Sequence, residues 1–327
     1  MSEFSIIDDY FKPLDRIGCD QFGSEGIGIG DDGAVLACPE DHQLVVVTDT
    51  LIEGVHFPKA TRPYDIAWKA LAVNLSDLAA MGAQPAFYTL ALSLPKAFAH
   101  ATFLQDFAEG LRALSSRFHL PLVGGDTTRS DCLALTITAH GWLPTGMAIL
   151  RSGAQEGDQI YVSGCIGDGA LALEALLGRY DAKKLDASVF EKFNRPVPKI
   201  ALGSLIQGKA HAAIDISDGL LADLRHILDA SHLSADLDFA KIPFSDSVKS
   251  YLASTGNYQL PIIGGDDYEL CFTLSAKQAE VLKAELPDDL QIYCIGEVRK
   301  QSEDLIVWRN LPIDFRDELG KGGFQHF

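Results

Sequence analysis

Three things are scarce or missing in this 327-residue chain, and each excludes a class of protein. None of its six cysteines belongs to a C-x-x-C pair, so a zinc site is not expected. No stretch is long and apolar enough to span a bilayer. Only 27 Lys and Arg stand against 45 Asp and Glu, a net charge of −18. That balance argues against binding to nucleic acid or to an anionic membrane surface.

The remaining composition is that of an ordinary globular protein. The chain is 47% hydrophobic and 22% charged, and its length suits two domains, which we place at residues 1–150 and 151–327. The N-terminus, MSEFSIIDDYF, lacks the basic and then apolar pattern of a signal peptide. The scattered cysteines are typical of reduced, mostly buried thiols. We therefore expect a cytoplasmic protein.

Several common catalytic motifs are also absent. The chain has no G-x-x-x-x-G-K-[ST] loop, no protein-kinase motifs and no G-x-S-x-G elbow. Residues 28–33, GIGDDG, do fit the dinucleotide pattern G-x-G-x-x-G. That motif must lie between a strand and a helix, and two adjacent aspartates would repel a pyrophosphate. We therefore interpret this segment as a loop that presents Asp31 and Asp32 to a metal, with a turn carrying solvated carboxylates as the alternative.

The chain does contain a recurring pattern, an apolar run followed by aspartate. It appears in VVVTD, LAVNLSD, LPLVGGD, AAIDISD and LPIIGGDD. In the first of these, Val45–Val47 predicts a buried strand that stops at Thr48, Asp49 and Thr50. A single such aspartate could equally cap the next segment, but the recurrence favours a site. The candidate carboxylates are Asp31, Asp32, Asp49, Asp77, Asp126, Asp215, Asp218, Asp266 and Asp267.

The local sequence around these carboxylates predicts how each is presented. A helix over about 62–81 carries Asp77 beside an apolar stripe, where a buried carboxylate needs a partner or a metal. Gly124 and Gly125 predict a tight turn ahead of Asp126. Asp215 interrupts an apolar strand, whereas Asp218 suits the N-cap of the next helix.

Carboxylates without a cysteine or histidine cluster favour magnesium, calcium or manganese. Magnesium typically binds one or two carboxylates and takes further ligands from substrate phosphates. Phosphoryl transfer depends on positioning and charge neutralisation more than on a protein nucleophile. The residues therefore indicate a magnesium-dependent enzyme that acts on a phosphorylated substrate together with a nucleotide.

Six segments in this order closely resemble the thiamine-monophosphate kinase family: GIGDDGAV, TDTLIEGVHF, NLSDLAAMGA, GGDTTRS, ISDGLLADL and GGDDYELCFT. The resemblance implies an α+β fold of two α/β domains, with a C-terminal mixed sheet flanked by helices. It further implies a homodimer whose N-terminal strands form a joint barrel. The implied reaction is direct transfer of the ATP γ-phosphate to thiamine monophosphate, with several Mg²⁺ ions as cofactors.

The resemblance also implies roles for individual residues. The magnesium ligands would be Asp32, Thr48, Asp49, Asp77, Asp126, Asp215 and Asp218, of which Asp49, Asp77 and Asp126 would be catalytic. ATP would contact Gly125, Asp126, Arg151 and Ser217, and thiamine monophosphate would contact His56, Asp266 and Phe324. Two positions depart from the family, which usually has Glu in place of Asp266 and often Tyr or Trp in place of Phe324.

Other functions remain open at this point. Sibling enzymes of the same superfamily include aminoimidazole ribonucleotide synthetase, selenophosphate synthetase and a hydrogenase-maturation protein. Cys19 lacks the nearby lysine of the second, and the chain ends in HF without the functional cysteine of the third. TDTLIEGVHF and NLSDLAAMGA point away from the first. A metal- and nucleotide-binding protein without turnover is the alternative from another class.

Overall fold

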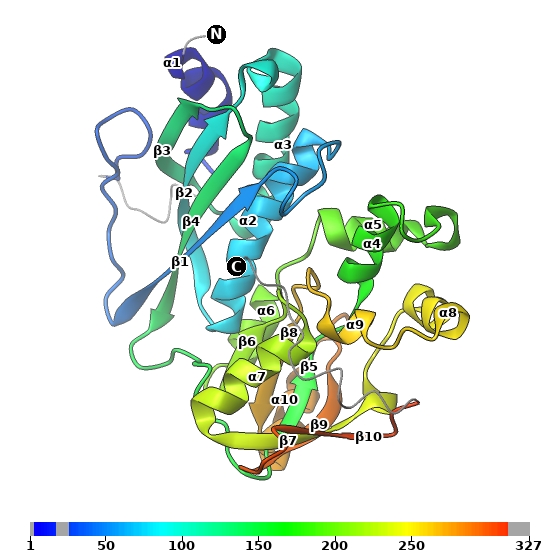
Figure 1. Ribbon diagram of the computed structural model, residues 1–327. Coiled ribbons are helices and arrows are strands. Elements are labelled where there is room, and N and C mark those ends of the chain that lie inside the picture. Colours follow the sequence, from blue (N-terminus) through cyan, green and yellow to red (C-terminus); the bar gives the residue numbers. More distant parts are fainter. Residues whose placement is uncertain (1–2, 18–25, 313–327) are drawn as a thin grey trace. The chain divides into compact units, whose positions relative to one another are not determined.

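The computed structural model describes residues 3–17 and 26–312. The chain divides into two compact units, Met1–Leu78 with Ala83–Gly146 (unit 1) and Ala79–Gly82 with Met147–Phe327 (unit 2). Each unit is built around one β-sheet with helices against it (Figure 1). The predicted α+β fold with two sheets flanked by helices is therefore confirmed.

Unit 1 contains a four-stranded sheet in the order β1-β4-β2-β3, in which β2 and β3 are parallel and the other pairs antiparallel. Helices α2 and α3 lie against this sheet (Figure 1). Its elements are α1 (Glu3–Ile6), β1 (His42–Ile52), α2 (Pro63–Ala80), β2 (Gln84–Leu94), α3 (Ala101–Phe118), β3 (Leu122–Arg129) and β4 (Ala134–Pro144).

The predicted helix around Asp77 is confirmed as α2. Its apolar stripe is fully buried, with Ala67, Leu71, Leu75 and Leu78 all at 0% exposure. Burial of such a stripe supplies most of the stability of a helix in a folded protein. Asp77 lies beside the stripe and is half-buried.

Two predictions for unit 1 are wrong. The strand at Val45–Val47 does not stop at Thr48, because β1 continues to Ile52 in register with β4. The strand is also not buried throughout as predicted, since Val46 is 55% exposed. The predicted turn at Gly124 and Gly125 is absent, because both glycines lie within β3 and pair with β2.

Unit 2 contains a six-stranded mixed sheet in the order β10-β7-β9-β5-β8-β6, in which only β10 and β7 are parallel. Its strands are β5 (Gln159–Val162), β6 (Ala212–Asp215), β7 (Leu233–Asp238), β8 (Leu270–Leu274), β9 (Tyr293–Lys300) and β10 (Ile306–Arg309). Its helices are α4 (Asp168–Leu176), α5 (Ala187–Asn194), α6 (Ile200–Ile206), α7 (Leu220–Ser231), α8 (Asp246–Thr255), α9 (Leu260–Ile263) and α10 (Ala276–Glu285).

The main core of unit 2 joins one helix to the central strands. Leu220, Leu224 and Ile227 of α7 pack with Ile160 and Ile295 of the sheet, all at 0% exposure. The helix begins later than predicted: its N-cap is Gly219, and no side chain caps it. The prediction that Asp218 caps this helix is therefore wrong.

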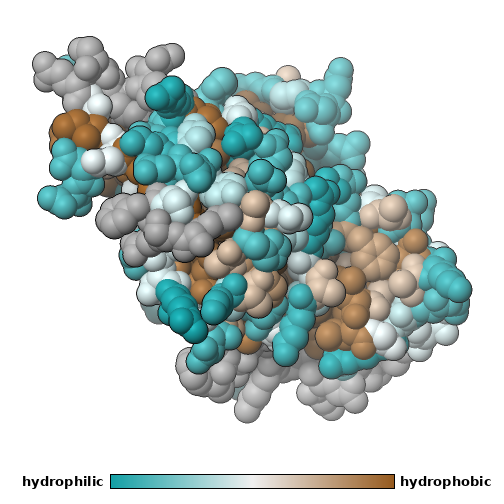
Figure 2. Space-filling model, turned by 90° about the horizontal axis from the view of Figure 1, so that it is seen from above, coloured by the Kyte–Doolittle hydropathy of each residue, from teal (hydrophilic) through white to brown (hydrophobic). Residues whose placement is uncertain are grey.

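The surface, the helices and the cysteines bear on three predictions from composition. Hydrophilic side chains cover much of the face seen in Figure 2, with apolar side chains in patches among them. Within residues 3–17 and 26–312, no helix is long and apolar enough to cross a membrane. The cysteines in these ranges are free, but Cys38 and Cys132 are exposed and Cys271 alone is buried. The expectation of mostly buried thiols is wrong.

Candidate functional site

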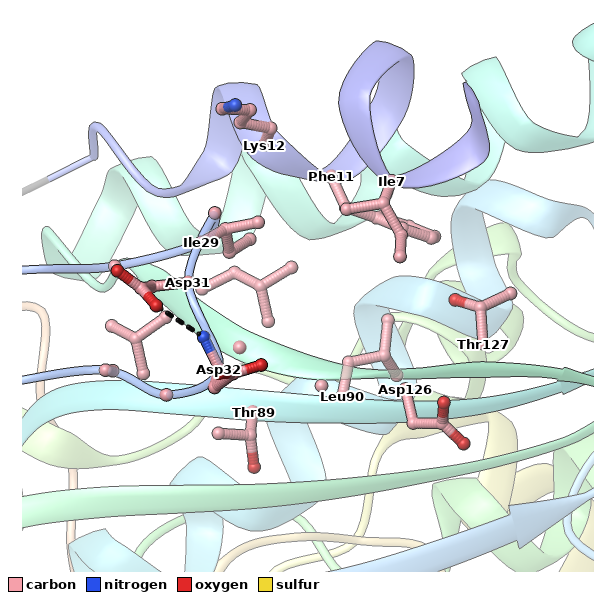
Figure 3. A pocket seen from close by; sticks show the side chains of 18 of the residues that line it. Ile7, Phe11, Lys12, Ile29, Asp31, Asp32, Thr89, Leu90, Asp126 and Thr127 are labelled. Atoms are coloured by element: carbon pink, nitrogen blue, oxygen red, sulfur yellow. Dashed lines mark hydrogen bonds between the residues drawn. The ribbon is translucent and has the colours of Figure 1, made fainter. Parts of the chain in front are cut away.

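Unit 1 contains a cavity of about 650 Å³ that brings three predicted site residues together (Figure 3). Asp32 enters it from the loop 28–34, and Gly125 and Asp126 enter it from β3. The opposite wall is the N-terminal helical segment, from which Ile7 and Phe11 point toward the strands. The same wall also contributes Asp8 and Lys12, so the cavity has charged as well as apolar lining on this side.

The backbone around the cavity allows close approach. The carboxylates of Asp32 and Asp126 belong to exposed residues, while Asp31 accepts the amide N–H of Asp32 at 2.9 Å. A Cβ on Gly125 would lie 1.9 Å from the carbonyl oxygen of Leu90, so only glycine fits at this position. The loop 28–34 forms isolated bridges and leads into no helix, which agrees with the rejection of a dinucleotide motif.

Strand β1 carries the next predicted residues of unit 1 on alternating faces. The Thr48 hydroxyl lies on the exposed face and donates to the carbonyl oxygen of Ile137 at 3.2 Å. Asp49 lies on the other face and is half-buried. Beyond the strand, His56 accepts the amide N–H of Ile52 on Nδ1 at 3.0 Å. The neutral imidazole therefore carries its proton on Nε2, as a hydrogen-bond donor.

In unit 2 the segment 215–219 brings Asp215, Ser217 and Asp218 together at the end of β6. Its backbone is held by Asp223, whose Oδ2 accepts the amide N–H groups of Ser217, Asp218 and Gly219 at 3.0–3.1 Å. Burial, together with the neighbouring charges of Asp215 and Asp218, raises the pKa of Asp223 to about 8.

Asp223 was not among the carboxylates predicted from the sequence, although it supports the backbone that carries them. It is only 3% exposed and lies in the first turn of α7, among leucines that form the core. Its signal was a carboxylate on the apolar face of the helix in ISDGLLADL, which is expensive unless it is paired.

The second Gly-Gly-Asp segment carries Asp266, which accepts a hydrogen bond from the Tyr268 hydroxyl at 3.1 Å. The neighbouring Asp267 points elsewhere, since its oxygens accept the amide N–H groups of Gly167 and Gly169 at 2.8 and 3.2 Å. Burial raises the pKa of Asp267 well above its ordinary value, and those two hydrogen bonds oppose the shift.

The predicted site residues are thus divided between the two units, and each unit presents its own set. Arg151 of unit 2 is exposed, and Phe324 lies outside the described residues. Within the described ranges, no three His, Cys, Asp or Glu side chains are grouped so that they could hold a metal by themselves. Unit 1 presents Asp32, Thr48, Asp49, His56, Asp77, Gly125 and Asp126, and unit 2 presents Arg151, Asp215, Ser217, Asp218 and Asp266.

Comparison with known families and proteins covers nearly the whole chain. The AIR synthase related protein N-terminal domain matches residues 30–143, and the corresponding C-terminal domain matches residues 155–309. The thiamine-monophosphate kinase of Escherichia coli (strain K12) is 41% identical over 332 residues, which cover 99% of this chain and 98% of that protein.

Solved structures of thiamine-monophosphate kinases also resemble this chain over nearly its whole length. The crystal structure of thiamine-monophosphate kinase from Stenotrophomonas maltophilia K279a has a TM-score of 0.83 and 40% identity, over 94% of this chain and 97% of that one. AaThiL complexed with AMPPCP and TMP has a TM-score of 0.76 and 28% identity, over 99% and 97%. Since full-length relatives at this identity share a family, this chain belongs to the thiamine-monophosphate kinase family, with both AIR synthase related domains.

Proposed function

We propose that this protein transfers the γ-phosphate of ATP to thiamine monophosphate, giving thiamine diphosphate and ADP. The observation that carries the proposal is the end-to-end similarity to thiamine-monophosphate kinases, including AaThiL, which binds AMPPCP and TMP. AMPPCP is an ATP analogue with carbon in place of the β,γ-bridging oxygen, so that protein binds both an ATP analogue and TMP. The chain is a phosphotransferase on this reading.

The acidic residues of the cavity in unit 1 fit a divalent cation. Asp32 and Asp126 line the same cavity and offer carboxylate oxygens, which magnesium prefers. We propose the same role of magnesium ligand for Thr48, Asp49 and Asp77 in unit 1 and for Asp215 and Asp218 in unit 2. When bound, Mg²⁺ ions neutralise phosphate charge and lower the repulsion between the two anionic substrates.

The proposed chemistry needs no protein nucleophile. A phosphate monoester is largely ionised near neutral pH, so its oxygen can attack the γ-phosphorus directly. The new P–O bond forms as the bond from the γ-phosphorus to the β-phosphate oxygen breaks, and ADP leaves in line with the attack. The protein's task is to hold the two phosphates in that line.

The remaining roles are assigned by the same proposal. Gly125, Arg151 and Ser217 contact ATP, with Gly125 allowing the phosphates to approach the backbone of β3. His56 donates from Nε2 to the substrate, because its Nδ1 is engaged by Ile52. Asp266 contacts the thiamine moiety, as does Phe324. We assign metal binding, ATP binding and dimerisation to residues 1–150, and residues 151–327 complete the nucleotide and substrate site.

We also propose a homodimer that forms through β1. This strand pairs only with β4 in the described sheet, so its outer edge is available to a second chain. Its exposed face carries Leu44 and Val46, which are 44% and 55% exposed. Sedimentation of the wild type beside a Val46→Lys variant tests this interface.

We further propose a cytoplasmic location, supported by the free cysteines of the described ranges.

The test of function is mass-spectrometric detection of thiamine diphosphate from ATP and thiamine monophosphate, with and without magnesium. We expect product only when the metal is present. Binding of both substrates without product would favour the non-catalytic alternative. ATP consumption with the substrate of a sibling enzyme, but not with thiamine monophosphate, would assign the chain to that sibling activity.

A further inference from the structure

The segment Gly264–Tyr268 holds an unusual backbone conformation next to a proposed substrate contact. Asp266 has φ 68° and Tyr268 has φ 50°, so both non-glycine residues lie in the left-handed region. Such a backbone conformation is strained for a residue with a side chain and persists only where the surrounding structure holds it. Something in unit 2 must therefore hold this segment in place.

On one side, Asp267 anchors the segment to the start of α4. Its two carboxylate oxygens accept the amide N–H groups of Gly167 and Gly169, which lie about a hundred residues earlier in the chain. The fit at this contact is tight, since a Cβ on Gly169 would lie 2.3 Å from the carbonyl oxygen of Asp266. These two hydrogen bonds and the close contact at Gly169 hold the segment Gly264–Tyr268 against the start of α4.

On the other side, the same segment is bound to the strand end that carries Ser217. The amide N–H of Asp266 donates to the carbonyl oxygen of Ser217 at 2.9 Å, and that of Tyr268 donates to Ile216 at 2.8 Å. The amide N–H of Ile216 donates in turn to Glu269 at 2.7 Å. Asp267 thus lies between α4 and the backbone that presents Asp266 and Ser217.

We propose that Asp267 is a positioning residue, which fixes the backbone of Asp266 and Ser217 in the geometry that receives the two substrates. The proposal rests on the proposed function for the identity of those substrates. Asp267 itself does not reach them, because its oxygens are turned toward Gly167 and Gly169. It acts on the reaction only through the residues that it holds.

The kinetic test compares Asp267→Ala and Asp267→Asn with a matched control, Asp186→Ala. Asp186 also accepts an amide N–H near a helix start, that of Ser188 at 2.8 Å, but it serves α5. We expect Asp267→Ala to raise KM for thiamine monophosphate about tenfold or more with a smaller loss of kcat. Asp267→Asn keeps one acceptor and should be intermediate, while Asp186→Ala should match the wild type in both constants. Equal constants in Asp267→Ala and Asp186→Ala would overturn the proposal.

A second measurement does not depend on activity. Hydrogen–deuterium exchange of the substrate-free wild type should show protected amides at Gly167, Gly169, Asp266 and Tyr268, because each donates a hydrogen bond. Asp267→Ala should raise exchange at all four by about tenfold or more, whereas Asp186→Ala should leave them unchanged. Unchanged exchange at Asp266 and Tyr268 in Asp267→Ala would refute the positioning role even if the protein proved to act on another substrate.

Discussion

The two segments LPLVGGD and LPIIGGD differ at two apolar positions, yet they fold differently. In unit 1, Leu122 onward forms strand β3, and the glycines pair with β2 in parallel register. In unit 2, Leu260–Ile263 forms the short helix α9, and Gly264 follows it as its C-cap. The local sequence is almost the same, so the neighbouring elements decide the conformation.

The difference extends to the aspartate that ends each segment. Asp126 continues the strand opposite Ala91 and is exposed in the cavity. Asp266 is in the left-handed region, half-buried, and bound by Tyr268. An exposed carboxylate can bind a solvated cation, whereas a carboxylate that accepts a hydrogen bond from a hydroxyl has its side chain held in one orientation. The comparison supports a metal role for Asp126 and a substrate role for Asp266.

The largest expected effect separates those two roles. Asp126→Asn keeps the size of the side chain and removes its charge, so the fold should persist while phosphate charge is less well neutralised. We expect kcat to fall by roughly 10²–10³-fold, the range for loss of one key electrostatic group. Steady-state kinetics at saturating ATP, with a magnesium titration, measures it. A kcat within twofold of the wild type at every magnesium concentration would remove Asp126 from the metal site.

The next effect is a loss of stability when alanine replaces individual glycines of the two segments. A Cβ on Gly125, Gly264 or Gly265 would lie 1.9, 2.3 or 2.0 Å from Leu90 O, Ala170 Cβ or Ser217 O. On Gly124 it would meet nothing closer than 4.0 Å. Alanine at each of the first three positions should therefore lower the free energy of unfolding by about 1–3 kcal/mol.

Gly124→Ala is the internal control of this series, and urea denaturation measures all four variants. We expect Gly124→Ala to match the wild type within about 0.5 kcal/mol, as surface substitutions do. A loss in Gly124→Ala as large as that in Gly125→Ala would mean that the strand does not tolerate any side chain there. The predicted difference in tolerance between Gly124 and Gly125 would then be wrong.

Features that depend on local sequence patterns could be predicted, and those that depend on strand pairing could not. Helix α2 was predictable because its stripe of Ala67, Leu71, Leu75 and Leu78 is a local pattern. Asp126 was singled out because a carboxylate directly after an apolar run is unusual, and it does line the cavity of unit 1. The conformation of Gly124 and Gly125 was not, since it depends on pairing with β2.

The roles of the supporting carboxylates were not predictable for a related reason. Asp267 bonds to Gly167 and Gly169, which are far from it in the sequence, so no spacing rule connects them. Asp218 looked like an N-cap, but the N-cap is Gly219, and the amide N–H groups of Asp218 and Gly219 donate to Asp223. Simple spacing and capping rules do not identify a carboxylate that stabilises backbone outside its own turn.

A smaller effect should appear at Asp266. Asparagine tolerates the left-handed region as aspartate does, so Asp266→Asn should preserve the backbone while it removes the charge. We expect KM for thiamine monophosphate to rise about tenfold, equal to ~1.4 kcal/mol of binding, with kcat nearly unchanged. Asp288→Asn, at an exposed position, is the control. A fall in kcat with constant KM would place Asp266 with the metal ligands instead.

The smallest effect uses one substitution at both aspartates. Glycine occupies the left-handed region freely, so Asp266→Gly relieves strain and offsets the lost bond from Tyr268. Asp126→Gly removes a side chain from an extended strand and makes the unfolded chain more flexible, so it should destabilise. The two changes in unfolding free energy should therefore differ by about 1 kcal/mol, with Asp126→Gly the less stable. Thermal and urea denaturation of both variants measures the difference. Equal losses would mean that the backbone of Asp266 is not strained, and the contrast between the two segments would then lie in their side chains alone.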